Sequence, residues 1–252
     1  MQLFKSILDL EQETGRPADK RRTARYAVGD GFPFKVKLTL FPKGGASDAK
    51  GKDWSATPVE FSATGASVQL SMAAVAYQRE TCRLKFALRD YQLEIPATIN
   101  HFRCAAQYSL CGITFNLSNP ELKKAYQQIL EPIIIGNSLP PANAVQDVPG
   151  RHKDKFGGGA AAELTVLRTA PGGQITGFDL RMHQYMVRWA EGSPELELFT
   201  LNVGSSAASA GRAPRADLQY DEIRRLFSFT IPNLAESIPA DVRKFFRGLM
   251  PS

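Results

Sequence analysis

Residues 26–115 alternate between apolar and polar side chains with a period of two, and this pattern constrains the fold more than any other feature of the sequence. In FPFKVKLTLF, polar side chains alternate with apolar ones that share one face of an extended strand: Phe34, Val36, Leu38 and Leu40. The same alternation recurs in TCRLKFAL, YQLEIPATI and YSLCGITFNL, and PVEFSATGASVQLSM indicates two strand pieces broken around Gly65. Five to seven short strands joined by tight turns predict a small antiparallel β-barrel, because closing a sheet removes its exposed edges.

The segment SNPELKKAYQQIL, which begins at Ser118, is typical of a helix that closes the barrel region. Ser118 or Asn119 can accept hydrogen bonds from the first backbone amides, and Pro120 suits the first turn. Apolar side chains repeat along one stripe of the helix, which we expect to be buried: Leu122, Ala125, Tyr126, Ile129 and Leu130.

The composition changes after this helix, because residues 136–161 are rich in Pro, Gly and Ala and show no periodicity. We interpret residues 136–161 as a linker between two domains. The predicted order is an N-terminal amphipathic helix and arm at 1–17, a β-barrel domain at 18–135, the linker, and an α+β domain of unknown function at 162–252. The fold class expected for the chain is therefore mainly β with α+β.

The overall composition describes an ordinary globular protein. Its 31 Lys and Arg residues against 25 Asp and Glu residues give a formal net charge of +6, which alone does not indicate nucleic acid as a partner. No apolar run approaches the ~20 residues that a membrane helix needs, and acidic residues come too early in MQLFKSILDLEQE for a secretory signal. Cys82, Cys104 and Cys111 fit no zinc pattern and are interpreted as small core residues in a reducing compartment. We expect a cytoplasmic protein without a transmembrane segment.

The sequence nominates no catalytic or metal site. His101, His152 and His183 are scattered without metal-ligand spacing, and we expect core or surface positions for them. The glycines of FGGG and PGGQITG lack the Lys-Ser/Thr of a phosphate-binding P-loop and are interpreted as a linker and a turn. Asp and Glu residues are too dispersed to suggest a catalytic pair. We therefore predict that the protein is not an enzyme.

Basic side chains crowd directly before the first strand, in the segment ADKRRTARYAV. There Arg21-x-x-x-Arg25 precedes the predicted barrel, and Glu60-x-Ser62-x-x-Gly65 lies inside it. Together the two motifs resemble the PilZ domain, a bacterial family that pairs an RxxxR motif with a (D/N)xSxxG motif and in which many members bind the second messenger cyclic di-GMP. The resemblance covers about residues 18–132, and the C-terminal domain resembles no family that we recognise.

The resemblance implies cyclic di-GMP as the ligand and no other cofactor. Planar guanidinium groups match phosphate oxygens and the O6/N7 edge of guanine, so Arg21 and Arg25 are candidate contacts, with Arg22 as a third. A carboxylate at Glu60 can accept from the N1 and N2 edge of guanine. Ser62 would hydrogen-bond a ligand oxygen or hold the turn, and Gly65 would permit a positive φ and close approach.

One residue departs from the family pattern, because Glu60 stands where nucleotide-binding members usually have Asp or Asn. One extra methylene moves the carboxylate by about 1.5 Å. We expect a cyclic di-GMP receptor for signal transduction, in which ordering of the Arg-rich arm (residues 18–28, ADKRRTARYAV) transmits binding to a protein partner that the sequence does not name. The alternative is a PilZ-like scaffold that binds no nucleotide and mediates protein–protein interaction. Glu60 favours the scaffold, and the intact RxxxR motif opposes it.

Direct binding to nucleic acid is the least favoured hypothesis. It requires a basic face with exposed aromatic side chains for stacking. The strongest basic cluster is confined to one short arm.

Overall fold

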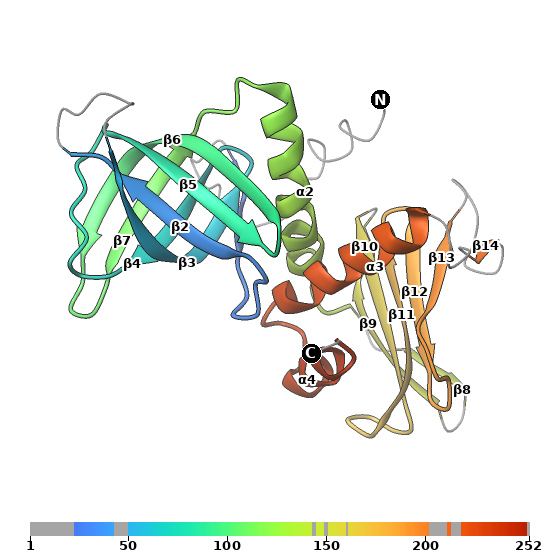
Figure 1. Cartoon of the computed structure of the whole chain (residues 1–252). Coiled ribbons are helices and arrows are strands. Elements are labelled where there is room, and N and C mark those ends of the chain that lie inside the picture. The colour runs from blue at the N-terminus through green and yellow to red at the C-terminus, as the bar shows by residue number, and fades with distance from the viewer. Residues whose placement is uncertain are drawn as a thin grey trace.

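The structure is a computed structural model of the chain, and it contains two antiparallel sheets of seven strands each, with helices between them (Figure 1). The residues that it describes are 23–42, 50–142, 145–148, 151–159, 161–201, 211–212 and 218–250. The predicted N-terminal helix and arm at 1–17 lie outside these ranges, and so do Arg21 and Arg22.

The first sheet closes into a barrel. Its strand order is β1-β3-β2-β5-β6-β7-β4, and β3 also pairs with β4, so that β2 to β7 form a ring of six strands and β1 adds to β3. Its strands are β1 (Arg25–Ala27), β2 (Lys35–Leu40), β3 (Lys52–Ser62), β4 (Gly65–Leu70), β5 (Thr81–Leu88), β6 (Tyr91–Cys104) and β7 (Ser109–Phe115). The antiparallel barrel predicted from the alternating pattern is confirmed.

The inside of the barrel is filled by the apolar half of that pattern. Leu38, Leu84 and Ile95 have no exposed surface, and aromatic rings such as Phe61 and Phe86 pack among them with centroids 5.6 Å apart. Burying this much apolar side-chain surface is the main driving force for folding the domain.

The helix α2 (Pro120–Asn137) closes the barrel as predicted, and Asn119 rather than Ser118 caps it. The Asn119 side chain accepts hydrogen bonds from the backbone amides of Glu121 and Leu122, at 2.9 and 3.3 Å. Tyr126 on this helix is fully buried, with its ring 4.8 Å from that of Phe115.

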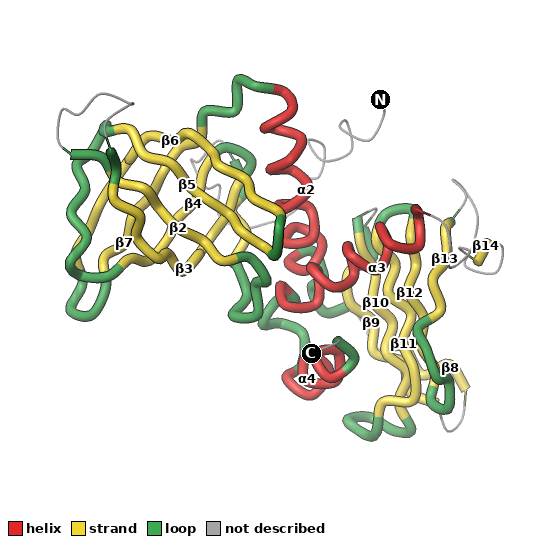
Figure 2. The backbone as a smooth tube through the Cα atoms, viewed as in Figure 1, coloured by secondary structure: helices red, strands yellow, loops and turns green. Residues whose placement is uncertain are grey.

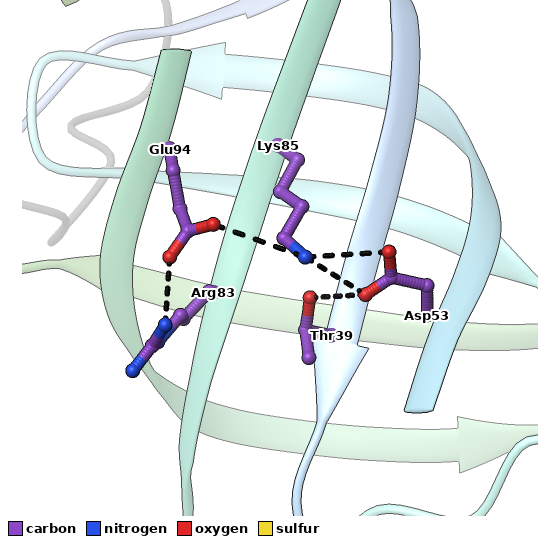
Figure 3. Close-up of polar contacts among 5 residues, drawn as sticks. All are labelled: Thr39, Asp53, Arg83, Lys85 and Glu94. Atoms are coloured by element: carbon purple, nitrogen blue, oxygen red, sulfur yellow. Dashed lines mark hydrogen bonds and ion pairs between the residues drawn. The ribbon is translucent and has the colours of Figure 1, made fainter. Parts of the chain in front are cut away.

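Polar side chains form a network on the outer face of the barrel, across β2, β3, β5 and β6 (Figure 3). The Lys85 ammonium lies 3.0 Å from the carboxylate of Asp53 and 3.8 Å from that of Glu94, and Arg83 donates to Glu94 at 2.9 Å. The hydroxyl of Thr39 donates to Asp53 at 2.6 Å, and this hydrogen bond, followed by that from Lys85, lowers the pKa of Asp53. These pairs are half-exposed, so they favour the register of the sheet more than they add stability.

The segment predicted to be a linker is largely structured. Within residues 136–161, α2 continues to Asn137, and the strands β8 (Val145–Val148) and β9 (Arg151–Gly157) follow. Phe156 of β9 pairs with Leu164 and is buried in the hydrophobic core of the second sheet. This packing explains why the Gly-rich segment is ordered. The domain boundaries remain a prediction.

The second sheet has the order β14-β13-β12-β11-β10-β9-β8. Its other strands are β10 (Ala162–Arg168), β11 (Ile175–Met182), β12 (Tyr185–Ala190), β13 (Glu197–Thr200) and β14 (Gly211–Arg212). The helices α3 (Leu218–Thr230) and α4 (Ala240–Gly248), with the 3-10 turn η3 (Ile231–Asn233) between them, complete this region. The helix α4 packs on the second sheet, with the ring centroid of Phe246 4.5 Å from that of Phe178 and the ring centroid of Phe245 5.2 Å from that of Trp189.

The helix α2 belongs to both cores. Ile133 is buried in the core of the barrel and Ile135 in that of the second sheet, and α2 and α3 lie between the two sheets (Figure 2). No helix within the described ranges is long and apolar enough to cross a membrane.

The cysteines only partly match the predicted core positions. Cys82 and Cys111 are buried, and burial raises the pKa of both thiols to about 12, whereas Cys104 is exposed. Cys104 ends β6, and its thiol accepts from the hydroxyl of Ser109 at 3.7 Å instead of packing in the core.

Replacing Arg168 by alanine should lower the free energy of unfolding by about 3 kcal/mol, the low end for breaking a buried ion pair. The Arg168 side chain is 3% exposed and holds β10 to β9 and α4 through Asp154, at 2.6 Å, and Asp241, at 2.7 Å. Its loss strands the carboxylate of Asp154 in a half-buried position, while Asp241 can turn to water. Urea unfolding of Arg168→Ala and of a control variant, Arg188→Ala, measures the effect.

Arg188 pairs with Asp179 at a similar distance of 2.6 Å, but both side chains are more than a third exposed. We therefore expect a loss of only about 0–1 kcal/mol for the control. Equal losses in the two variants would contradict the structural role given to Arg168.

Candidate functional site

Two strands of the barrel each carry one extra residue at the same region of its outer surface. In β3, Pro58 faces Val68 but Glu60 faces the next residue of β4, Ser67, so that Val59 is the inserted residue. Such an insertion is a β-bulge, which turns the following side chains to the opposite faces of the sheet. Phe61 is thereby directed into the core, where it is fully buried, and Glu60 is directed outward.

The second bulge lies in β6. Ile99 faces Ile113 of β7, and His101 faces Gly112, so that Asn100 is the inserted residue. Phe102 consequently packs against the core, and His101 turns to the outer surface. Within the described residues of the barrel, register shifts occur only at these two places.

The two bulges face each other across a shallow depression. The pairing places Glu60, Ser67, Gly112 and His101 in one row across β3, β4, β7 and β6. Strand spacing gives a distance of roughly 14 Å between the ends of the row. Small side chains form its floor. The depression has a volume of about 70 Å³, so a ligand would lie against it rather than inside it.

The described residues of both sequence motifs line this depression: Arg25, Glu60, Ser62 and Gly65. Arg25 on β1 faces Ser62 on β3, and its guanidinium lies 3.2 Å from the carboxylate of Glu60. Both side chains are about 40% exposed, so the pair is a surface ion pair of small net stability. The structure thus brings together the motif residues that it describes, while Arg21 and Arg22 lie outside the described ranges.

Ser62 holds the turn between β3 and β4, which is one of the two roles predicted for it. Its hydroxyl donates to the carbonyl of Gly65 at 3.2 Å and accepts from the amide of Thr64 at 3.4 Å. The hydroxyl of buried Tyr126 donates to the carbonyl of Ser62 at 2.7 Å. Helix α2 therefore fixes the position of this motif from inside the barrel.

Gly65 is required for close approach, and the positive φ that a glycine would permit there is not adopted. Its φ is not among the positive values of the described glycines, because the residue begins the regular strand β4. A Cβ atom at this position would lie 2.3 Å from the carbonyl oxygen of Ile113. The absent side chain thus lets β4 pack tightly against β7.

Sequence reasoning missed the residues that β6 and β7 contribute to the depression, among them Asn100, His101 and Thr114. Asn100 donates to the hydroxyl of Thr114 at 2.5 Å. The pKa of His101 is lowered, first by burial and then by the charges of Arg103 and Arg25. One signal was available: in β6 the apolar positions Ile95, Ala97 and Ile99 are followed by Phe102, so the alternation slips by one residue.

A larger hollow of about 750 Å³ lies between the turn after β10 and helix α4. Its buried cation, Arg168, is neutralised by Asp154 and Asp241 and also donates to the carbonyl of Gly173 at 2.8 Å. Arg168 is therefore not free to bind an anion in this hollow, which Glu191, Asp241 and Lys244 also line. Among the residues that the structure describes, no group of three His, Cys, Asp or Glu side chains is placed to hold a metal ion.

No family model and no curated protein matches the chain. Among solved structures it is similar to that of a K. pneumonia MrkH–c-di-GMP complex, at 12% identity and a TM-score of 0.36, over 46% of this chain and 53% of that one. It is also similar to the Bacillus subtilis inhibitor of motility (MotI/DgrA), at 15% identity and a TM-score of 0.31, over 45% of this chain and 50% of that one. The chain thus spans about half the length of each, and similarities this weak assign no function.

Substituting Gly65 by alanine should lower the free energy of unfolding by about 2 kcal/mol, since the new methyl group meets a backbone carbonyl that cannot move aside. Gly159→Ala serves as control, because a Cβ there has no neighbour within 4 Å. Thermal or urea unfolding measures both. A Gly65→Ala variant as stable as the control would show that the close approach of β4 and β7 is not a constraint.

Proposed function

We propose that the barrel is a PilZ-like domain that binds cyclic di-GMP at the depression between β1, β3 and β6. The observation that carries the proposal is the convergence of Arg25, Glu60, Ser62 and Gly65 on one surface depression. The two motifs are far apart in the sequence, and β1 pairs with β3 at the residues that carry them. Guanidinium and carboxylate groups side by side suit a ligand with both phosphates and guanine edges.

Binding begins with the opening of the ion pair between Arg25 and Glu60. Because this pair is half-exposed, opening it costs about 0–1 kcal/mol, a loss of no more than about fivefold in affinity. Arg25 is then available to a phosphate or to the O6/N7 edge of guanine. The carboxylate of Glu60 becomes free to accept from the N1 and N2 edge, and Arg21 and Arg22 supply the remaining cationic contacts in this proposal.

The base of the Arg-rich arm is connected to the rest of the molecule, which supports transmission of binding to a protein partner. The side chain of Asn137 at the end of α2 donates to the carbonyl of Ala27 at 2.9 Å. The amide of Gly29 donates to the side chain of Asn233 in η3 at 3.0 Å. A ligand that orders the arm would thus act on both α2 and the C-terminal helices, provided that it binds one arrangement better.

The Arg25–Glu60 contact is also compatible with the alternative function, a PilZ-like scaffold that binds no nucleotide. In that case Glu60 neutralises Arg25 permanently, and the depression has no cationic function. Protein partners would then recognise the barrel surface itself.

Single substitutions Arg21→Ala and Arg25→Ala should each weaken cyclic di-GMP binding roughly tenfold to a hundredfold, the equivalent of a lost charge-assisted hydrogen bond of about 1.5–3 kcal/mol. Calorimetric titration of the full chain measures the dissociation constants. Arg224→Ala is the matched control, because it removes the same charge from an exposed position on α3. Absence of binding by the unsubstituted protein would leave the scaffold as the function, and unchanged affinity in both variants would refute the site.

Glu60→Gln distinguishes the two roles of the carboxylate. The amide keeps an acceptor oxygen but no longer neutralises Arg25. If Glu60 mainly competes with the ligand for Arg25, the variant should bind cyclic di-GMP about two- to fivefold more tightly. If the carboxylate receives the guanine N1 and N2 edge, binding should weaken instead, by about tenfold. Titrations at low and high salt measure the difference, since the competing ion pair is screened by salt.

A further inference from the structure

The bulge in β6 turns His101 toward the same depression from the side opposite to Arg25. His101 lines the depression together with Asn100, while the next residue, Phe102, packs on the core. His101 is half-buried, so part of the residue remains accessible to a ligand. Nothing in the sequence motifs includes this residue. Its outward direction follows from the inserted residue Asn100.

The residue facing His101 leaves room for the imidazole. A Cβ on Gly112 would lie 1.9 Å from Cε1 of the His101 ring, so the ring rests directly on the backbone of β7. Ser67, the next residue of the row, is also small. The ring is therefore held at the floor level of the depression, with no large side chain between it and Glu60 at the other end.

The charges around the depression are unequal at its two ends. At one end the carboxylate of Glu60 is paired with Arg25, whereas the end at His101 has Arg103 on the same strand and no carboxylate among the described lining residues. The charge of Arg25 also acts on His101. The strands β7 and β4 contribute only Gly112 and Ser67 to the row, and Arg79 and Glu80 belong to the backbone segment that pairs with Ile99. Burial and the two arginines lower the pKa of His101, so the free protein holds it neutral at pH 7.

We propose that His101 is a further ligand-binding residue, which contacts a phosphate of the cyclic dinucleotide and takes up one proton as the ligand binds. The inference rests on the proposed function, because it concerns the same depression. A nucleotide whose guanine contacts Glu60 would place its sugar–phosphate backbone toward the other end of the row, where His101 lies. A phosphate there favours the imidazolium, which donates from both ring nitrogens.

Proton uptake fixes the direction of the pH dependence. The bound phosphate raises the pKa of His101 above its lowered value in the free protein, so the complex binds more protons than the separate partners. Affinity therefore increases as the pH falls through the pKa of the complex, and it becomes constant below that of the free protein. A difference of one unit between the two pKa values corresponds to about a tenfold change in affinity.

The test is calorimetric titration of the full chain with cyclic di-GMP between about pH 8 and pH 6, where imidazole changes charge. Repeating each titration in two buffers of different ionisation enthalpy gives the number of protons taken up. The unsubstituted protein should bind up to about tenfold more tightly at the lower pH. His101→Gln should bind more weakly at the lower pH and lose both the pH dependence and the proton uptake. His152→Gln is the matched control, because His152 lies on the second sheet and pairs with Asp154.

A second variant displaces the ring without removing it. Gly112→Ala places a methyl group where the imidazole lies, so it should reproduce the loss of proton uptake, with thermal unfolding used to verify that the barrel is folded. Proton uptake that persists in His101→Gln, or binding by the unsubstituted protein that does not change with pH, would overturn this inference and leave the proposed function intact. Absence of binding at every pH would refute the proposed function itself.

Discussion

The strand β3 must pair with three neighbours, and the rest of the barrel depends on how it does so. Its first half, from Lys52 to Ala56, pairs with β2, and its second half pairs with β4 on one edge and β1 on the other. The change of partner occurs at Thr57 and Pro58, directly before the inserted Val59. A strand that bends here can belong to both ends of the sheet at once, and this double pairing closes the ring.

The closure of the barrel and the position of the candidate site both result from the bend of β3 at Val59. The bulge that lets β3 bend also directs Glu60 outward, beside Arg25 on β1. A corresponding insertion in β6 directs His101 outward at the other end of the row. A β-bulge interrupts the regular hydrogen bonding between strands and changes the direction of the side chains that follow it. In this barrel both bulges direct polar side chains to the same depression. The core remains closed, because Phe61 and Phe102 turn inward in exchange.

The 3-10 turn η3 joins the barrel to the second sheet through main-chain contacts that leave no room for side chains. A Cβ on Gly29 would lie 1.8 Å from the carbonyl oxygen of Pro232, and one on Gly136 would lie 2.4 Å from that of Asn233. Asn233 is 2% exposed, and its side chain accepts from the amide of Gly29 and donates to the carbonyl of Phe229. Close packing around η3 therefore brings together the segment that follows the Arg-rich arm, the helix α2 and the C-terminal helices.

The sequence by itself determined the antiparallel barrel, its closing helix and the motif residues Arg25, Glu60, Ser62 and Gly65, because alternation and short motifs are local properties. The strands within residues 136–161 could not be predicted in this way, because β9 pairs with a strand that comes later in the chain. The slip in alternation before Phe102 is visible in the sequence, but only the tertiary structure identified Val59 and Asn100 as the inserted residues and placed His101 at the depression. A one-residue insertion changes which face a side chain occupies, and its effect exists only relative to the neighbouring strand.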